Sequence, residues 1–178
     1  MLSRVLFYLL TASVLAAITF FITRNLIVQQ APVKVMSTIE GRIAAGAGGW
    51  NACFHNQVYG PRSNAARRAN PDSIISYMAY DLSTGPVRIS GKTWPRYWSL
   101  SLYQQNSDNF FVINDQELPG PDFDFVLTLS DQKTGDLSGT VIVSPTMKGI
   151  MLIRRFAADE SDMPGIIANQ DALYCGPA

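Results

Sequence analysis

The sequence predicts a mainly β protein: an antiparallel β-sandwich with short flanking helices and one N-terminal transmembrane helix. Between residues 74 and 156, apolar side chains largely alternate with polar ones, and this two-residue period is typical of strands with one buried face. Turn residues interrupt the pattern roughly every 8–12 residues, without long helical crossovers, as in sandwiches and barrels. The uncharged run at residues 5–23 accounts for the transmembrane helix.

Residues 1–4 form a short leader, and residues 5–23, VLFYLLTASVLAAITFFIT, carry no charge, proline or glycine. At about 1.5 Å per residue, a helix of this length spans roughly the hydrocarbon thickness of a bilayer. A signal peptide has a shorter apolar core that is followed by a pair of small residues at the cleavage site. Here Gln29 stands two places before Ala31, so that pair is missing. We therefore expect residues 5–23 to remain as an anchor in the lipid bilayer.

The orientation of this anchor is only weakly encoded. Arg4 lies on one side of the apolar run, and Arg24 and Lys34 lie on the other, so the positive-inside count is nearly balanced. A short leader ahead of a long polar segment favours export of the polar segment.

Residues 24–35 are predicted to be a tether, and residues 36–178 a single exported β domain. Ser37 and Glu40 have the spacing of a capping box, which predicts that a helix starts at Ser37 and ends at the glycines that follow residue 45. The stretch 51–72 has no periodicity and many turn residues, so we expect it to be irregular.

The strands are expected in sequence order from residue 74. In the segment 96–105, Trp98, Leu100 and Leu102 should face the core, and the alternating residues, including Ser99 and Ser101, should face solvent. A short helix is expected at 162–174, with Asp162 as its N-cap. The predicted strands are 74–82, 87–90, 96–105, 110–114 and 123–131, with two more in 139–156 joined around residues 145–149.

The chain has two cysteines, Cys53 and Cys175. In an exported domain a single pair predicts one disulfide, and two buried free thiols are the alternative. There is no Cys-x-x-Cys motif and no Cys/His cluster, so the sequence predicts neither a metal site nor a cofactor. The formal net charge is zero, which argues against binding to nucleic acid, because phosphate neutralisation needs surplus Lys and Arg.

Two segments, NPDSIISYMAYDLSTGPVRIS and RYWSLSLYQQNSDNFFVIND, occur in order within Trp50–Asn114. In this region the chain resembles the bacterial family known as domain of unknown function twelve fifty-four. It departs from the family pattern at residues 73–75, where Ser, Ile and Ile replace the usual Thr, Leu and Tyr. The matching positions are Asn70, Asp72, Asp81, Leu82, Ser83, Gly85, Pro86, Val87, Arg96, Tyr97, Trp98, Ser99, Leu102, Tyr103, Asn109 and Phe110.

The resemblance implies a jelly-roll-like fold but no established reaction. Longer relatives carry a second uncharacterised domain, twelve fourteen, and this chain resembles the first half alone. We therefore expect a single-pass protein of the bacterial inner membrane, with most of the chain in the periplasm. We also expect a partner: a second membrane-anchored protein related to that second domain, which would contact the stretch 50–70 and the terminal helix after Asp159.

Two kinds of site are considered. His55, the only histidine, could serve as a base for Ser99 or Ser101, with Asp72 or Asp81 orienting it, as in a hydrolase. No Gly-x-Ser-x-Gly elbow accompanies it, and no residue is predicted to be catalytic. Aromatic rings beside amides could instead bind a carbohydrate or small ligand. The candidate ligand-binding residues are His55, Asp72, Arg96, Tyr97, Tyr103 and Asn109.

From the sequence we expect a membrane-anchored, non-enzymatic envelope protein that assembles with this partner. A carbohydrate or small-ligand binding module is the first alternative, and a hydrolase-like enzyme is the second.

Overall fold

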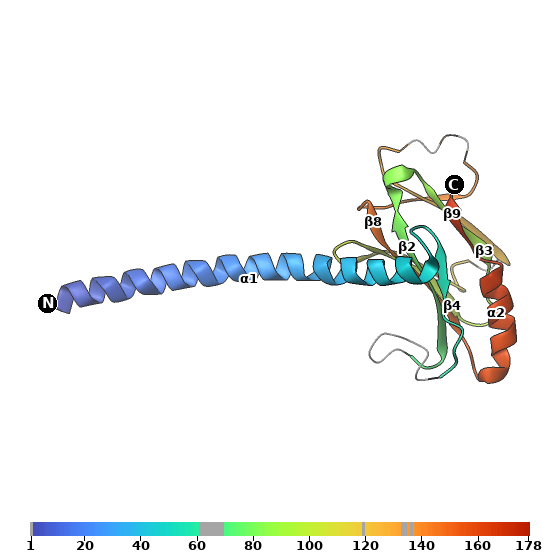
Figure 1. The fold of residues 1–178 in the computed structure, drawn as a ribbon, viewed down its shortest axis with the longest axis horizontal. Helices are drawn as coiled ribbons and strands as arrows, with labels where there is room; N and C mark the ends of the chain where they lie inside the picture. The colour runs from blue at the N-terminus through green and yellow to red at the C-terminus, as the bar shows by residue number, and fades with distance from the viewer. Residues whose placement is uncertain (1, 61–69, 119, 133–134, 136) are drawn as a thin grey trace.

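The computed structural model describes residues 2–60, 70–118, 120–132, 135 and 137–178 (Figure 1). A long helix projects from a β-rich body, and a short helix lies against one side of that body. The helices and strands are α1 (Leu2–Ala47), β1 (Cys53–His55), β2 (Ser73–Asp81), β3 (Val87–Lys92), β4 (Trp98–Gln104), β5 (Asn109–Asn114), β6 (Asp122–Thr128), β7 (Thr140–Val143), β8 (Lys148–Phe156), α2 (Met163–Asp171) and β9 (Tyr174–Pro177).

The strands form two sheets, which confirms the mainly β prediction. The five-stranded sheet has the order β1-β2-β8-β4-β5, and the four-stranded sheet has the order β7-β6-β3-β9. All neighbouring strands pair antiparallel except β6 and β7, which are parallel. Strands β7 and β8 follow one another along the chain but belong to different sheets.

Both sheets contribute to one hydrophobic core. Met78, Leu100 and Met151 come from the five-stranded sheet, and Ile89 and Leu127 come from the four-stranded sheet. The predicted core face of β4 is confirmed, because Trp98, Leu100 and Leu102 are all buried. The opposite face was expected to be exposed to solvent, but Ser99 and Ser101 are buried as well. The two serines lie on a central strand, and the Arg154 guanidinium of the neighbouring strand reaches Ser101 Oγ at 3.3 Å.

Helix α1 is continuous from Leu2 to Ala47 and contains Pro32. Residues 24–35, expected to be a tether, are therefore helical, and the predicted helix start at Ser37 is wrong. Ser37 Oγ donates to the Lys34 carbonyl within the helix, and Glu40 is buried against the β body rather than bonded at a helix end.

The last turns of α1 pack on the outer face of the five-stranded sheet. Met36, Ile43 and Ala44 form a buried cluster with Ala79 of β2 and Ile150 of β8. This packing explains why Ala79 is as fully buried as Met78, which lies on the opposite face of β2.

Between β2 and β3 the chain crosses from one sheet to the other through a short 3-10 turn at Leu82–Thr84. The Asp81 carboxylate accepts a hydrogen bond from Ser83 N at 2.9 Å, and Leu82 is fully buried. Gly85 has a φ of 137°, a conformation that residues with a Cβ rarely adopt. The run Asp81–Val87 singled out in the sequence is thus a structural crossover.

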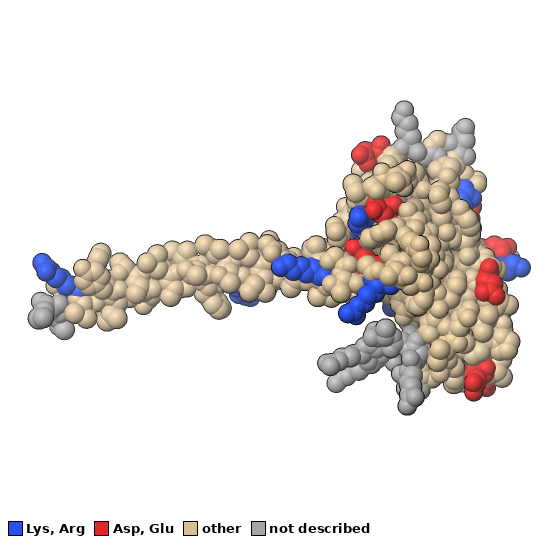
Figure 2. Space-filling model, in the orientation of Figure 1, with Lys and Arg blue, Asp and Glu red and all other residues tan. Residues whose placement is uncertain are grey.

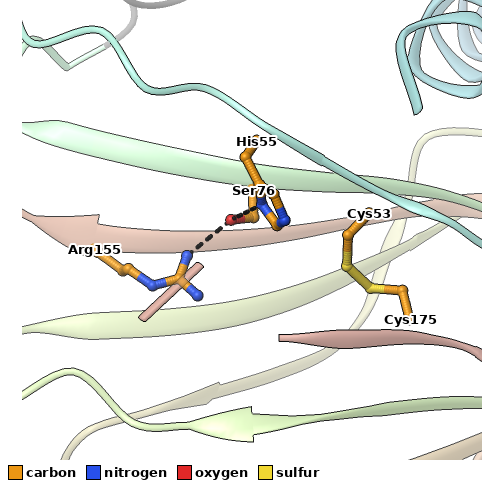
Figure 3. The surroundings of a disulfide bond; sticks show 5 residues. All are labelled: Cys53, His55, Ser76, Arg155 and Cys175. Carbon is orange, nitrogen blue, oxygen red and sulfur yellow. Dashed lines mark hydrogen bonds between the residues drawn. A yellow bond between two sulfur atoms is a disulfide. The ribbon is translucent and has the colours of Figure 1, made fainter. Parts of the chain in front are cut away.

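The predicted disulfide between Cys53 and Cys175 is present, with a Cα–Cα distance of 5.5 Å (Figure 3). Cys53 lies on β1, an edge strand of the five-stranded sheet, and Cys175 lies on β9, an edge strand of the four-stranded sheet. The bond therefore joins the two sheets covalently, across a sequence separation of 122 residues.

We predict that replacing both cysteines by serine lowers the free energy of unfolding by about 3–5 kcal/mol, because the bond restricts the unfolded chain. Denaturant unfolding of the detergent-solubilised protein measures this difference. Thiol labelling of denatured, unreduced wild-type protein should find no free sulfhydryl, and two labelled cysteines would contradict the disulfide.

Candidate functional site

A group of polar side chains lies between the sheets near the disulfide, and we call it the core polar cluster. Three of its members face the core from neighbouring strands: His55 on β1, Ser76 on β2 and Arg155 on β8. The other two, Asn169 and Gln170, come from α2. Arg155 is 1% exposed, and Ser76 and Gln170 are fully buried.

The core polar cluster is connected by hydrogen bonds (Figure 3). His55 Nδ1 lies 2.9 Å from Ser76 Oγ, and an Arg155 guanidinium nitrogen donates to the same oxygen at 2.9 Å. The Arg155 Nε donates to Asn169 Oδ1. Gln170 Nε2 donates to the Asn56 carbonyl at 3.1 Å, while its Oε1 is buried and has no hydrogen-bond partner among the described residues.

Burial controls the protonation of this cluster. Desolvation lowers the pKa of the Arg155 guanidinium to about 10, so Arg155 remains charged at neutral pH. Desolvation, followed by the Arg155 charge, lowers the pKa of His55. Because Arg155 already donates to Ser76 Oγ, the hydroxyl proton of Ser76 can point to Nδ1 of a neutral imidazole.

The cluster does not assemble the hydrolase site considered from the sequence. His55 contacts Ser76, whereas Ser99 and Ser101 lie on the opposite face of the sheet from the core. A serine nucleophile must be reached by its substrate, and Ser76 has no exposed surface. The cluster instead ties α2 to the sheets, since Asn169 Nδ2 also donates to the carbonyls of Lys92 and Thr93.

Asp72 and Arg96 do not join His55. Asp72 contributes its backbone to a turn, where its N–H is bonded by Asn70 Oδ1 and its carbonyl by Ala157 N. Arg96 pairs with Asp162 at 3.1 Å. Asp162 occupies the N-cap position of α2, as predicted, but its side chain makes no cap bond to the helix and accepts a hydrogen bond from Ala158 N instead.

The three remaining candidate ligand-binding residues are also dispersed. Tyr97 precedes β4 and is exposed, while Tyr103 lies near the other end of β4. Six residues of extended chain place them about 20 Å apart. Asn109 Nδ2 donates to the carbonyls of Leu102 and Phe111, where the register of β4 and β5 shifts. Asn109 therefore stabilises an irregularity of the sheet.

A second polar group lies where α1 meets the β body. Lys148 Nζ is 3.0 Å from Asp81 Oδ2 and 4.5 Å from the ring centroid of Trp50. Glu40 is 2% exposed, and in the part of the chain that the structure describes its buried Oε1 has no hydrogen-bond partner. Burial raises the pKa of the Glu40 carboxyl, an effect that Lys148 opposes and Asp81 reinforces. Among the described residues, no three His, Cys, Asp or Glu side chains are placed to hold a metal ion.

The sequence analysis did not identify Arg155, Ser76, Asn169 or Gln170. A signal for Arg155 was present, because the two-residue period of β8 places it on the same face as Met151 and Ile153. An arginine on the apolar face of a strand indicates a buried polar network. Nothing in the sequence indicates that α2 would supply the remaining members.

Comparisons with known proteins give a family match and two solved structures that are partly similar to this chain. The family model "Protein of unknown function (DUF1254)" matches residues 50–177. The VPA0106 protein from Vibrio parahaemolyticus has a TM-score of 0.55 at 16% identity, over 61% of this chain and 28% of its own. A putative uncharacterised protein from Burkholderia cenocepacia has a TM-score of 0.47 at 15% identity, over 78% of this chain and 38% of its own.

This chain thus spans well under half the length of either solved protein. The likeness to the Vibrio protein shows a shared fold. Among curated proteins, none matches this chain.

We predict that the free energy of unfolding falls as the pH drops below about 6.5, the ordinary pKa of histidine. The folded-state pKa of His55 is lowered, so in this window the unfolded chain binds a proton that the folded chain does not. Because His55 is the only histidine, His55→Asn should remove this part of the pH dependence. Urea unfolding of both proteins between pH 5.5 and 7.5 tests the sign. If the free energy of unfolding changes with pH equally in the wild type and in the variant, the prediction is contradicted.

Proposed function

This chain belongs to the family described as protein of unknown function (DUF1254), and from that membership we propose a function as a membrane-anchored envelope protein. In this proposal it catalyses no reaction. It holds a β domain next to the membrane, where the domain assembles with a separately encoded partner.

The observation that carries this proposal is the division of α1 into an exposed apolar part and a docked part. The first part is long and apolar enough to cross a membrane, a property shared by signal sequences. Its large apolar side chains from Val5 to Ile22 are exposed. Figure 2 shows this stretch without charged side chains between the basic residues near its two ends. The last turns are packed into the β body, so one continuous helix runs from the exposed apolar part into the domain core.

The proposed organisation has residues 1–4 as a leader, 5–23 in the bilayer, 24–35 as a linking segment of α1, and 36–178 as the exported domain. We propose that the two sheets form a jelly-roll-like sandwich, which the core shared by both sheets supports. The protein would lie in the bacterial inner membrane with the domain in the periplasm. The disulfide supports this placement, because such bonds persist in oxidising compartments.

The proposed partner is a membrane-anchored protein related to the second domain of longer family members. In support, the solved Vibrio relative resembles this chain over only 28% of its own length. The stretch before β2 presents exposed apolar side chains that a partner could cover, namely Trp50, Phe54 and Val58. Residues 61–69 of the predicted interface lie outside the described residues. Anchoring in one membrane would allow each contact to be weak, because confinement raises the effective concentration.

We predict that the mature protein retains residues 5–23. Intact-mass analysis of the protein purified from membranes should give the full chain, and a reporter enzyme fused to the C-terminus should be active only in a periplasmic form. A mature amino terminus near Gln30 would contradict the anchor. A cytoplasmic reporter signal would contradict its orientation.

We also predict that Val58→Asp reduces co-purification of the partner by about tenfold, because a charge placed in an apolar contact costs at least 1.4 kcal/mol. Val141→Asp is the matched control, since Val141 is an exposed valine on β7. Affinity purification in mild detergent, from cells that express such a relative, measures both. Recovery of the wild-type chain alone would count against the partner.

A further inference from the structure

An apolar stripe runs along α1 between the membrane-length segment and the β body. It consists of Val28, Ala31, Val35 and Ile39, spaced three, four and four residues apart. Such spacing places all four on one face of a helix. Val28 is 63% exposed, Val35 is 58% exposed and Ile39 is 37% exposed. Over about 16 Å of helix, this face offers exposed apolar surface, and beside it Ser107 Oγ of the β4–β5 turn donates to the Pro32 carbonyl at 3.4 Å.

The stripe lies on a different side of α1 from the face that docks on the domain. The buried residues of the same helical turns are Met36, Glu40 and Ile43, which follow one another at spacings of four and three and so share a different face. At about 100° per residue, the centres of the two faces are about 100° apart. Gln30, Lys34 and Ser37 occupy the remaining side of the helix. Docking of the domain therefore leaves Val28 and Val35 exposed, while Ile39 is more covered than the two valines.

The stripe also continues the seven-residue series Phe7, Val14, Phe21, Val28, Val35. A seven-residue apolar repeat keeps one seam of a helix facing a parallel neighbour, and β-branched residues in the first core position favour two strands. The intervening core positions include Ala17 and Ala31, whose small side chains let helices approach closely. Arg24 also occupies an intervening core position, at the end of the uncharged segment, where a long side chain can turn outward to reach the headgroups.

We propose that the stripe is the contact with α1 of a second copy of this chain, and that the two helices form a parallel coiled coil from the membrane to the domains. A second copy leaves the membrane at the same residue and in the same direction, so Val28 meets Val28 and Val35 meets Val35. The stripe carries no charge that would oppose its own copy. This inference rests on the proposed membrane anchor but not on the proposed partner.

Single-cysteine cross-linking in native membranes tests the pairing. Both native cysteines are in the disulfide, and no free cysteine is present, so an introduced thiol is the only reactive one. We expect Val28→Cys and Val35→Cys to give a dimer with a short bis-maleimide. Gln30→Cys and Ser37→Cys are the matched controls, because both positions are exposed and lie about 200° further round the helix. We expect at least about fivefold less dimer from the controls, since core positions approach most closely.

Equal cross-linking at the four positions, or no dimer at Val28 and Val35, would overturn the proposal. A product that contains a different protein at these positions would also overturn it, and would indicate a foreign helix on the stripe. The same membranes are extracted with alkaline carbonate. If the chain stays in the membrane pellet but gives no cross-linked dimer, the pairing is rejected and the anchor is retained. If the carbonate releases the chain, both the pairing and the anchor are rejected.

Discussion

The packing of the last turns of α1 on the five-stranded sheet is the contact on which the rest of the account depends. Met36 and Ile43 fill the space above Ala79 and Ile150, and burying each large side chain contributes about 2 kcal/mol. The same turns bury Glu40. Its Oε1 has no hydrogen-bond partner among the described residues, and the cost of burying that atom offsets part of the gain. This contact makes one element both an exposed apolar helix and a part of the domain core. Under the proposed anchor, the position of the domain relative to the membrane is then set by a helix rather than by a flexible link.

The alternating strands could be predicted because each has one face in the shared core. β2, β4 and β6 were identified to within a few residues, since apolar side chains recur at every second position over six or more residues. β1 and β9 were missed because three or four residues cannot display a period. They form because each is paired along an edge, and the Cys53–Cys175 bond holds them together. The parallel pairing of β7 is a tertiary property that local sequence does not encode.

The prediction that a helix begins at Ser37 failed for a different reason. Residues 24–35 are helical as well. Pro32 lies among them, but a proline removes only one helical hydrogen bond and a long helix can tolerate it. The Ser37 and Glu40 spacing was a false capping signal, because Glu40 is buried against the domain and does not close a helix end.

Individual site residues were less predictable than strands, because their partners come from distant parts of the chain. His55 meets Ser76 across a strand pair, and Asn169 reaches Arg155 from α2. The residues that carry the family pattern proved largely architectural: Asp81 and Gly85 build the crossover, and Asn109 bonds the irregular edge. Of these three residues, only Asn109 had been a candidate for a ligand site. The structure uses their hydrogen bonds to satisfy the backbone where strands end or shift register.

Amide hydrogen exchange over residues 24–35, in the full chain embedded in lipid nanodiscs, tests the central claim most directly. A continuous helix between membrane and domain predicts slow exchange throughout this segment, apart from the turn around Pro32, at rates well below those of an unstructured peptide. Exchange at unstructured rates across the segment would show a flexible link and would contradict the account.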